Sequence, residues 1–196
     1  MAKGWMSAAV AFSVLTLTAC GPREQQWSTQ EIRGAMPDLA FELTDERGDP
    51  VQADAFRGKF VLLFFGYTHC PDVCPATLAI LNAAIQQLGS AADQIEVLFV
   101  SVDPERDGPE QLSSYTSSFG DNVVGLTGTR AQLDKLTKRY RVTYRHDSPD
   151  EHGDYLVYHS GAVFAFDPQG RVRLLMSYTD GVPAIVHDLR QLVAAS

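Results

Sequence analysis

The chain has 196 residues, of which 45% are hydrophobic and 20% are charged, and this is enough for one well-buried domain of ordinary size. Its 24 acidic residues outnumber 16 lysines and arginines, so the formal net charge is −8. An acidic chain without a basic stripe is not expected to bind nucleic acid, which requires clustered cationic side chains.

The N-terminal segment has the layout of an export signal. Lys3 supplies a minimal positive region, residues 8–17 are apolar or small, and the sequence LTAC ends at Cys20. This stretch is too short to span a bilayer and is typical of a secretory signal. Because LTAC also resembles the bacterial lipobox, we expect a lipoprotein signal peptide over residues 1–19 and acylation of Cys20. The alternative is an ordinary signal peptide with a chance cysteine.

A lipidated flexible tether over residues 20–35 is expected next, and a single domain over residues 36–196. No second hydrophobic segment in the sequence approaches bilayer length, so the lipid chains would be the membrane attachment.

Hydrophobic periodicity and turn residues predict the elements of the domain. Residues 39–43 and a strand from Val51 form an N-terminal hairpin around a turn at 45–49. Further strands are expected at 60–65, 95–102, 123–126, 162–166 and 172–176, and helices at 75–88, 109–119, 129–140 and 183–194. The charged residues 141–158 are expected to form an exposed loop or small hairpin. This order of elements predicts one α/β domain with a mixed β-sheet flanked by helices.

Two cysteines, Cys70 and Cys74, lie between the 60–65 strand and the following helix, in which Pro75 fits the first position. A helix N-terminus favours the thiolate form of nearby cysteines. Because Cys20 is assigned to the lipid, this pair accounts for the rest of the three cysteines, and we expect it to be functional rather than a structural disulfide. Two such thiols either form a reversible disulfide or bind a soft metal.

His159 is the candidate for a third ligand, because it comes immediately before the 162–166 strand. It would approach the cysteines if this strand runs antiparallel to the 60–65 strand. Two thiolates and one imidazole suit Cu(I), whereas zinc prefers a fourth ligand. The remaining histidines are expected on the solvated surface (His146, His152), on a helix face or cap (His187), and beside the thiols without touching them (His69).

Carboxylates follow the 95–102 strand. If this strand is the parallel neighbour of the 60–65 strand, both loops lie at one sheet edge, where the sites of α/β proteins collect. Asp103 is then either a turn or capping residue or a group that shapes the cysteine loop from outside the ligand set. Asp72 has the same two interpretations, and neither residue is expected to be a ligand.

Three motifs occur in order along the chain: GYTHCPDVCPATL at residues 66–78, SVDPERD at 101–107, and YLVYHS at 155–160 followed by FDPQG at 166–170. Together they resemble the Sco/SenC family of thioredoxin-fold proteins, which help assemble the copper site of cytochrome c oxidase. The resemblance extends from about residue 36 to 194. It implies a thioredoxin-like domain that holds copper, as Cu(I) and also Cu(II), through Cys70, Cys74 and His159. The family usually has an aspartate before the ligand histidine, and Tyr158 in its place implies weaker copper retention or an altered partner.

The leading hypothesis is therefore a membrane-tethered copper metallochaperone on the periplasmic side of the inner membrane. It would deliver copper to the copper-site subunit of cytochrome c oxidase, with loading coupled to the redox state of the cysteine pair. A copper donor or a thiol reductant would be a further partner. The alternative is a thiol–disulfide oxidoreductase that keeps the oxidase cysteines reduced, with Cys70 as nucleophile and Cys74 as resolving thiol. A peroxiredoxin-like peroxidase is disfavoured, because only Thr68 matches that family's pattern and the upstream proline is absent.

Overall fold

The computed structural model describes residues 25–195. Its strands are β1 (Gln30–Glu31), β2 (Glu42–Asp45), β3 (Pro50–Gln52), β4 (Phe60–Gly66), β5 (Ile95–Ser101), β6 (Val123–Thr127), β7 (Tyr144–His146), β8 (Val157–His159), β9 (Ala162–Phe166) and β10 (Val172–Ser177). Its α-helices are α1 (Val73–Gln86), α2 (Pro109–Thr116), α3 (Arg130–Arg139) and α4 (Gly181–Ala194). None of the helices in this part of the chain is long and apolar enough to cross a bilayer.

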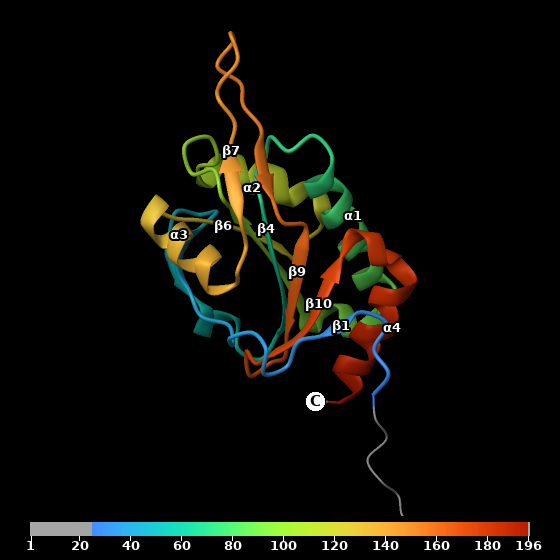
Figure 1. Cartoon of the computed structure of the whole chain (residues 1–196). Helices are drawn as coiled ribbons and strands as arrows, with labels where there is room; N and C mark the ends of the chain where they lie inside the picture. The colour runs from blue at the N-terminus through green and yellow to red at the C-terminus, as the bar shows by residue number, and fades with distance from the viewer. Residues whose placement is uncertain (1–24, 196) are drawn as a thin grey trace, which may run out of the picture.

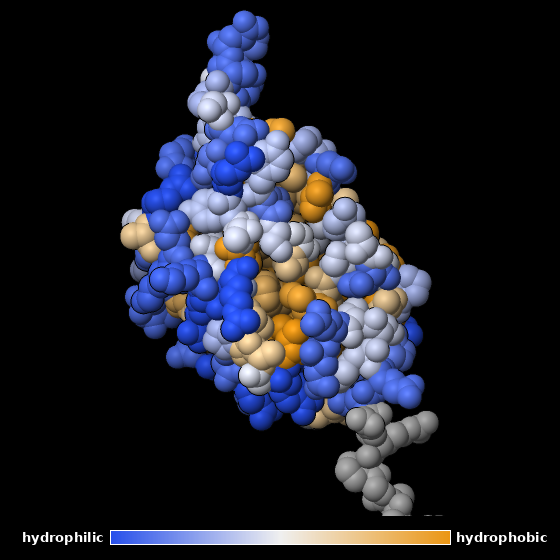
Figure 2. All heavy atoms as spheres, in the orientation of Figure 1, coloured by the Kyte–Doolittle hydropathy of each residue, from blue (hydrophilic) through white to orange (hydrophobic). Residues whose placement is uncertain are grey.

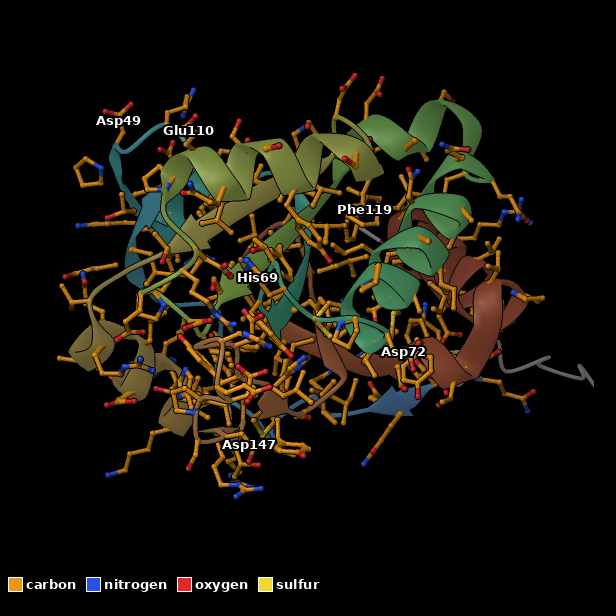
Figure 3. All side chains as sticks on the ribbon, turned by 90° about the horizontal axis from the view of Figure 1, so that it is seen from above. Asp49, His69, Asp72, Glu110, Phe119 and Asp147 are labelled. Atoms are coloured by element: carbon orange, nitrogen blue, oxygen red, sulfur yellow. The ribbon has the colours of Figure 1, made fainter. Side chains whose placement is uncertain are left out.

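Within residues 25–195, eight strands form a mixed sheet in the order β1-β10-β9-β4-β5-β6-β2-β3. Strands β4, β5 and β6 are parallel, and β9 is antiparallel to β4. Because the crossovers from β4 to β5 and from β5 to β6 advance in one direction, α1 and α2 lie on the same face, where α4 packs against α1. Helix α3 covers the other face (Figures 1 and 3). The predicted α/β class with a mixed sheet and an N-terminal hairpin, β2–β3, is confirmed.

The core explains why the strand before the cysteines is apolar throughout. Every residue of β4 is buried, because helices cover both faces of the sheet. On the α1–α2 face, the ring centroids of Phe64 and Phe99 are 6.0 Å apart. On the α3 face, the ring centroids of Phe65 and Tyr140 are 6.2 Å apart. These alternate directions follow the two-residue period of a strand. The position of the end of β4, and of the loop after it, is therefore set by packing on two sides.

The helix after the cysteines begins earlier than predicted, at Val73, and Pro75 is its third residue. Proline is tolerated in the first turn because the N–H groups there have no acceptor within the helix. The expectation that Pro75 occupies the first helical position is thus wrong, and Cys74 lies inside the first turn.

The chain before the predicted domain boundary is also packed against the sheet. Strand β1 pairs antiparallel with β10, and the backbone N–H groups of Ser28 and Thr29 each donate to the Asp188 carboxylate of α4 at 2.8 Å. Asp188 is fully buried. The expectation of a flexible tether through residue 35 is therefore wrong for residues 28–31, which belong to the domain. The predicted signal peptide and Cys20 lie outside the described residues.

Strands β7 and β8 form a separate antiparallel hairpin from the charged 141–158 segment. The loop that connects them projects from the domain (Figure 1), and its surface is hydrophilic (Figure 2). His159 is the last residue of β8, at the base of this hairpin, so the hairpin carries one of the candidate ligands.

Candidate metal centre

Cys70, Cys74 and His159 meet beyond the carboxyl end of β4. Their sulfur and nitrogen atoms all lie within 4.8 Å of one another, and Cys74 Sγ is 3.1 Å from His159 Nε2. No fourth histidine, cysteine or carboxylate among residues 25–195 joins this group. Strand β9 runs antiparallel to β4, which is the condition stated for the approach of His159, and this pairing places His159, just before β9, beside the end of β4.

The imidazole of His159 is oriented toward the thiols. Its Nδ1 lies 3.1 Å from the carbonyl oxygen of Ser160, which can only accept, so Nδ1 carries a proton. Nε2 is then the atom available to a metal. The rings of Phe64 and Tyr67 stand edge-on to the imidazole, with centroids 6.0 and 5.9 Å away. Aromatic rings on two sides limit rotation of this imidazole.

The two cysteines are free thiols in unequal environments. Cys74 is fully buried, whereas Cys70 is partly exposed. Hydrogen bonding by Cys74, whose backbone N–H also donates to Cys70 Sγ at 3.4 Å, holds the pKa of Cys70 well below its ordinary value. The hydrogen bond to Cys70, together with burial, raises the pKa of Cys74. Cys70 is therefore the thiolate of the pair and Cys74 the protonated partner.

Gly66, the last residue of β4, leaves room for the buried thiol. A Cβ atom at this position would lie 2.8 Å from Cys74 Sγ and 2.6 Å from Cε2 of Phe99. Both distances are shorter than van der Waals contact, so any larger residue would displace the sulfur or the ring. Glycine at this position thus permits the close approach of α1 to β4.

The cysteine loop is held by Asp107, a residue that the sequence analysis did not single out. Its fully buried carboxylate accepts hydrogen bonds from Thr68 N at 2.8 Å, from Thr68 Oγ1 at 2.6 Å and from Ser101 Oγ at 2.6 Å. These bonds join the loop after β4 to the end of β5. The sequence signal that could have identified Asp107 is its position at the end of the SVDPERD motif.

Asp103 faces the β7–β8 hairpin instead of shaping the cysteine loop. Its buried carboxylate accepts from Arg106 Nε and, at 2.7 Å, from the Tyr155 hydroxyl. His146 Nε2 lies 3.5 Å from Asp103 Oδ1, and its ring packs between Tyr144 and Tyr155. The expectation that His146 is solvated is therefore wrong.

Asp103, Glu105 and His146 also bring three potential ligand atoms within 4.8 Å of one another. Both carboxylates already form ion pairs with arginines, Asp103 with Arg106 and Glu105 with Arg130. A bound cation would have to displace these positive charges, so we assign the cluster to the anchoring of the hairpin and not to a second metal.

Three further residues singled out in the sequence lie around the site without joining the ligand group. Tyr158 is 53% exposed, and its ring lies 5.0 Å from the Arg145 guanidinium. His69 contacts Thr68 Oγ1 at 3.0 Å. Asp72 precedes α1 and makes no side-chain capping bond. Figure 3 shows Asp72 at the start of α1 and His69 nearer the middle of the domain.

The family model described as SCO1/SenC matches residues 30–194, which is most of the chain. The chain belongs to the SCO1/SenC family. The resemblance stated from its three motifs is thereby confirmed.

This SCO1/SenC chain is similar to the mouse protein named "Protein SCO2 homolog, mitochondrial", with 34% identity over 184 residues, covering 90% of this chain and 72% of the mouse protein. The aligned segments span 65% of the bovine SCO2 homolog and 56% of the human one. Among solved structures, copper-bound ScoI of Bradyrhizobium japonicum has 36% identity and a TM-score of 0.72, covering 79% of this chain and 98% of ScoI. A SCO1/SenC family lipoprotein of Bacillus anthracis has 27% identity and a TM-score of 0.65, covering 80% and 95%. These matches confirm the predicted thioredoxin-like fold class.

Proposed function

We propose that this protein is a copper metallochaperone that binds copper through Cys70, Cys74 and His159 and delivers it to the copper-site subunit of cytochrome c oxidase. The observation that carries the proposal is the convergence of two thiols and one imidazole nitrogen within 4.8 Å. It is supported by the copper-bound structure of the related ScoI. Delivery to the oxidase follows from the family to which the motifs belong.

The donor set favours Cu(I) over other metals. Two thiolate sulfurs and one imidazole nitrogen are soft or borderline ligands, which Cu(I) accepts in three-coordinate geometry. Zinc in a closed site takes four ligands, and residues 25–195 offer no fourth donor to this group. Copper binding displaces the proton of Cys74, because a thiol must be deprotonated to act as a ligand. His159 Nε2 needs no such deprotonation, since the ring proton is on Nδ1.

Release is coupled to the redox state of the cysteine pair. When a disulfide of a partner protein is reduced, the Cys70 and Cys74 thiolates lose two electrons and form one disulfide bond. Both sulfur ligands are then removed, and His159 alone does not retain the metal. Cys70 is the partly exposed ligand, so an incoming ligand from an acceptor replaces it first.

A lipid on Cys20 would tether the domain to the membrane, on the periplasmic side of the inner membrane. The described chain starts at the end of the domain opposite the projecting hairpin (Figure 1). A tether attached there directs the metal centre away from the anchor, toward a partner domain above the membrane surface. Mass spectrometry of the purified protein tests this arrangement, since the mature chain should begin with an acylated Cys20.

The second candidate is a thiol–disulfide oxidoreductase that keeps the copper-site cysteines of the oxidase reduced. It is favoured by one observation, the partly exposed Cys70 with a lowered pKa beside the buried Cys74. Cys70 would attack a partner disulfide and Cys74 would resolve the mixed disulfide. Thiol exchange does not require an imidazole, so His159 separates the two functions.

The deciding experiment is an anaerobic Cu(I) competition titration of the reduced protein beside His159→Ala. A matched control is His152→Ala, which removes an exposed histidine at the tip of the same hairpin. We expect one-to-one binding that weakens by about 100-fold, or about 2.7 kcal/mol, in His159→Ala and is unchanged in His152→Ala. Binding that ignores His159 would overturn the three-ligand site. Absence of binding, with exchange activity lost in Cys70→Ala and retained in His159→Ala, would establish the oxidoreductase instead.

A further inference from the structure

We propose that Arg106 is a positioning residue for His159, acting through the tyrosines that hold the β7–β8 hairpin on the domain. The inference rests on the proposed copper site and adds a residue outside its ligand set. Arg106 belongs to the loop after β5, whereas His159 comes from the base of the hairpin.

Arg106 lies between two aromatic rings. Its guanidinium carbon is 3.6 Å from the centroid of Tyr155 and 5.7 Å from that of Tyr67. Its Nε donates to Asp103, whose other carboxylate oxygen accepts from the Tyr155 hydroxyl at 2.7 Å. Tyr155 is therefore held by two contacts: the Arg106 guanidinium stacks on its ring face, and the Asp103 carboxylate accepts a hydrogen bond from its hydroxyl.

Both tyrosines connect to the segment that carries His159. Tyr155 lies in the connecting loop of the hairpin, two residues before β8 begins at Val157. Tyr67 follows β4, and its hydroxyl faces the backbone of Val157 in β8. The Tyr67 ring also stands perpendicular to the imidazole of His159 at 5.9 Å between centroids. Arg106 thus links the sheet edge that carries the cysteines to the strand that carries the histidine.

The hairpin needs such a link, because an isolated two-stranded sheet is marginal in stability and β7 and β8 do not join the main sheet. The guanidinium is also placed so that only part of its hydrogen-bonding capacity is used. Within the described chain, Arg106 Nη2 is buried and has no hydrogen-bond partner. Leaving a buried donor unpaired is unfavourable, so hydrogen bonding alone does not explain an arginine at this position. Planar stacking on the tyrosines, which lysine cannot reproduce, does explain it.

The consequence is a specific pattern of loss. Without the planar guanidinium, Tyr155 loses the group against its ring face, and β8 can move relative to β4. The Cys70 and Cys74 thiols stay in place, because Asp107 and the first turn of α1 hold their loop. Copper would then lose its histidine ligand and keep both sulfurs.

The test is a double-mutant cycle on Cu(I) affinity with Arg106→Lys, His159→Ala and the combined variant. Lysine keeps the charge opposite Asp103 and removes the planar stack, which keeps the risk of unfolding low. We expect Arg106→Lys to weaken binding about tenfold in the wild-type background and not at all in the His159→Ala background. An equal loss in both backgrounds, or no loss in either, would overturn the proposal.

Arg139→Lys is the matched control, because Arg139 also lies over a tyrosine, 5.9 Å from the Tyr140 centroid, and Tyr140 lies outside the hairpin that carries His159. Its Cu(I) affinity should equal that of the wild type.

A second readout does not depend on copper: the imidazole NMR signals of the metal-free protein. Arg106→Lys should shift or broaden the His159 signals and leave those of His152 unchanged, and unchanged His159 signals would overturn the proposal. A wild-type protein that binds no Cu(I) would refute the proposed function, while the NMR comparison would still decide the role of Arg106.

Discussion

Cys74 Sγ and His159 Nε2 lie 3.1 Å apart, although 85 residues separate them along the chain. The contact joins the first turn of α1 to the end of β8, two elements that reach each other only after β9 has paired with β4. A thiol and an imidazole in hydrogen-bond contact would bind the same metal ion. A change that moves either residue should therefore alter the copper affinity of the whole site.

Gly66→Ala should disturb the contact between Cys74 and His159, because the added methyl group would press on the Cys74 sulfur. The added methyl would lie 2.8 Å from Cys74 Sγ and 2.6 Å from the Phe99 ring, and overpacking of this kind costs about 1–3 kcal/mol. We expect a lower free energy of unfolding in urea and weaker Cu(I) binding. Gly161→Ala is the control, because its Cβ would meet Val73 Cγ1 at an ordinary 3.6 Å. Equal stability of the two variants would contradict the assigned role of Gly66.

The thiol reactivity of Cys70 should depend weakly on pH. Its pKa is lowered, chiefly by hydrogen bonding with Cys74, so the thiolate persists as pH falls from 8 through neutrality and is lost only near the lowered pKa. An ordinary thiol, with a pKa of about 8.5, would lose about tenfold in rate for each pH unit below that value. Iodoacetamide labelling followed by mass spectrometry measures both the rate and the site. Labelling should fall on Cys70 and not Cys74, and Cys74→Ala should restore a steep pH profile at Cys70; a steep profile in the native protein would refute the assignment.

Asp107→Asn should loosen the cysteine loop. The amide keeps the size of the side chain but offers one acceptor oxygen to three donors, two on Thr68 and one on Ser101. Loss of hydrogen bonds to a buried charged group should cost about 2 kcal/mol or more in the free energy of unfolding. Urea denaturation of the metal-free protein checks this, with Asp121→Asn, at an exposed position, as the control. If both variants unfold at the same urea concentration, Asp107 does not hold the loop.

Tyr158→Asp should change copper transfer more than copper binding. The Tyr158 ring is 53% exposed and lies against Arg145, on the surface that a partner would meet. We expect the Cu(I) affinity to change by less than about threefold, or about 0.6 kcal/mol, and the rate of transfer to an acceptor to change by more. Stopped-flow transfer to an oxidase copper-site domain measures the rate, with Tyr158→Phe, which keeps the ring on Arg145, as the control. Unchanged affinity together with an unchanged rate would show that the residue before His159 has no influence on the site.

Local sequence was sufficient for most of the elements and for naming the candidate ligands. The apolar runs of β4 and β5 predict buried strands, because parallel strands covered on both faces leave no polar side. The cysteine pair was identified by its position between a strand and a helix, and His159 by its place before β9. Their joint assignment to copper came from three motifs in a fixed order, which periodicity alone does not supply.

What the tertiary structure decided is which side chains hold the ligands in place. The sequence offered Asp72 and Asp103 near the site on nearly equal terms and did not single out Asp107. In the fold, Asp107 accepts hydrogen bonds from Thr68, 39 residues away in the sequence, and Asp103 accepts one from Tyr155, 52 residues away. The fold also packs Ser28 on Asp188 across 160 residues, where the composition of the segment had indicated a tether. Hydrophobic period and turn chemistry report on neighbours in the chain, whereas a buried carboxylate takes its donors from whichever elements the sheet brings beside it.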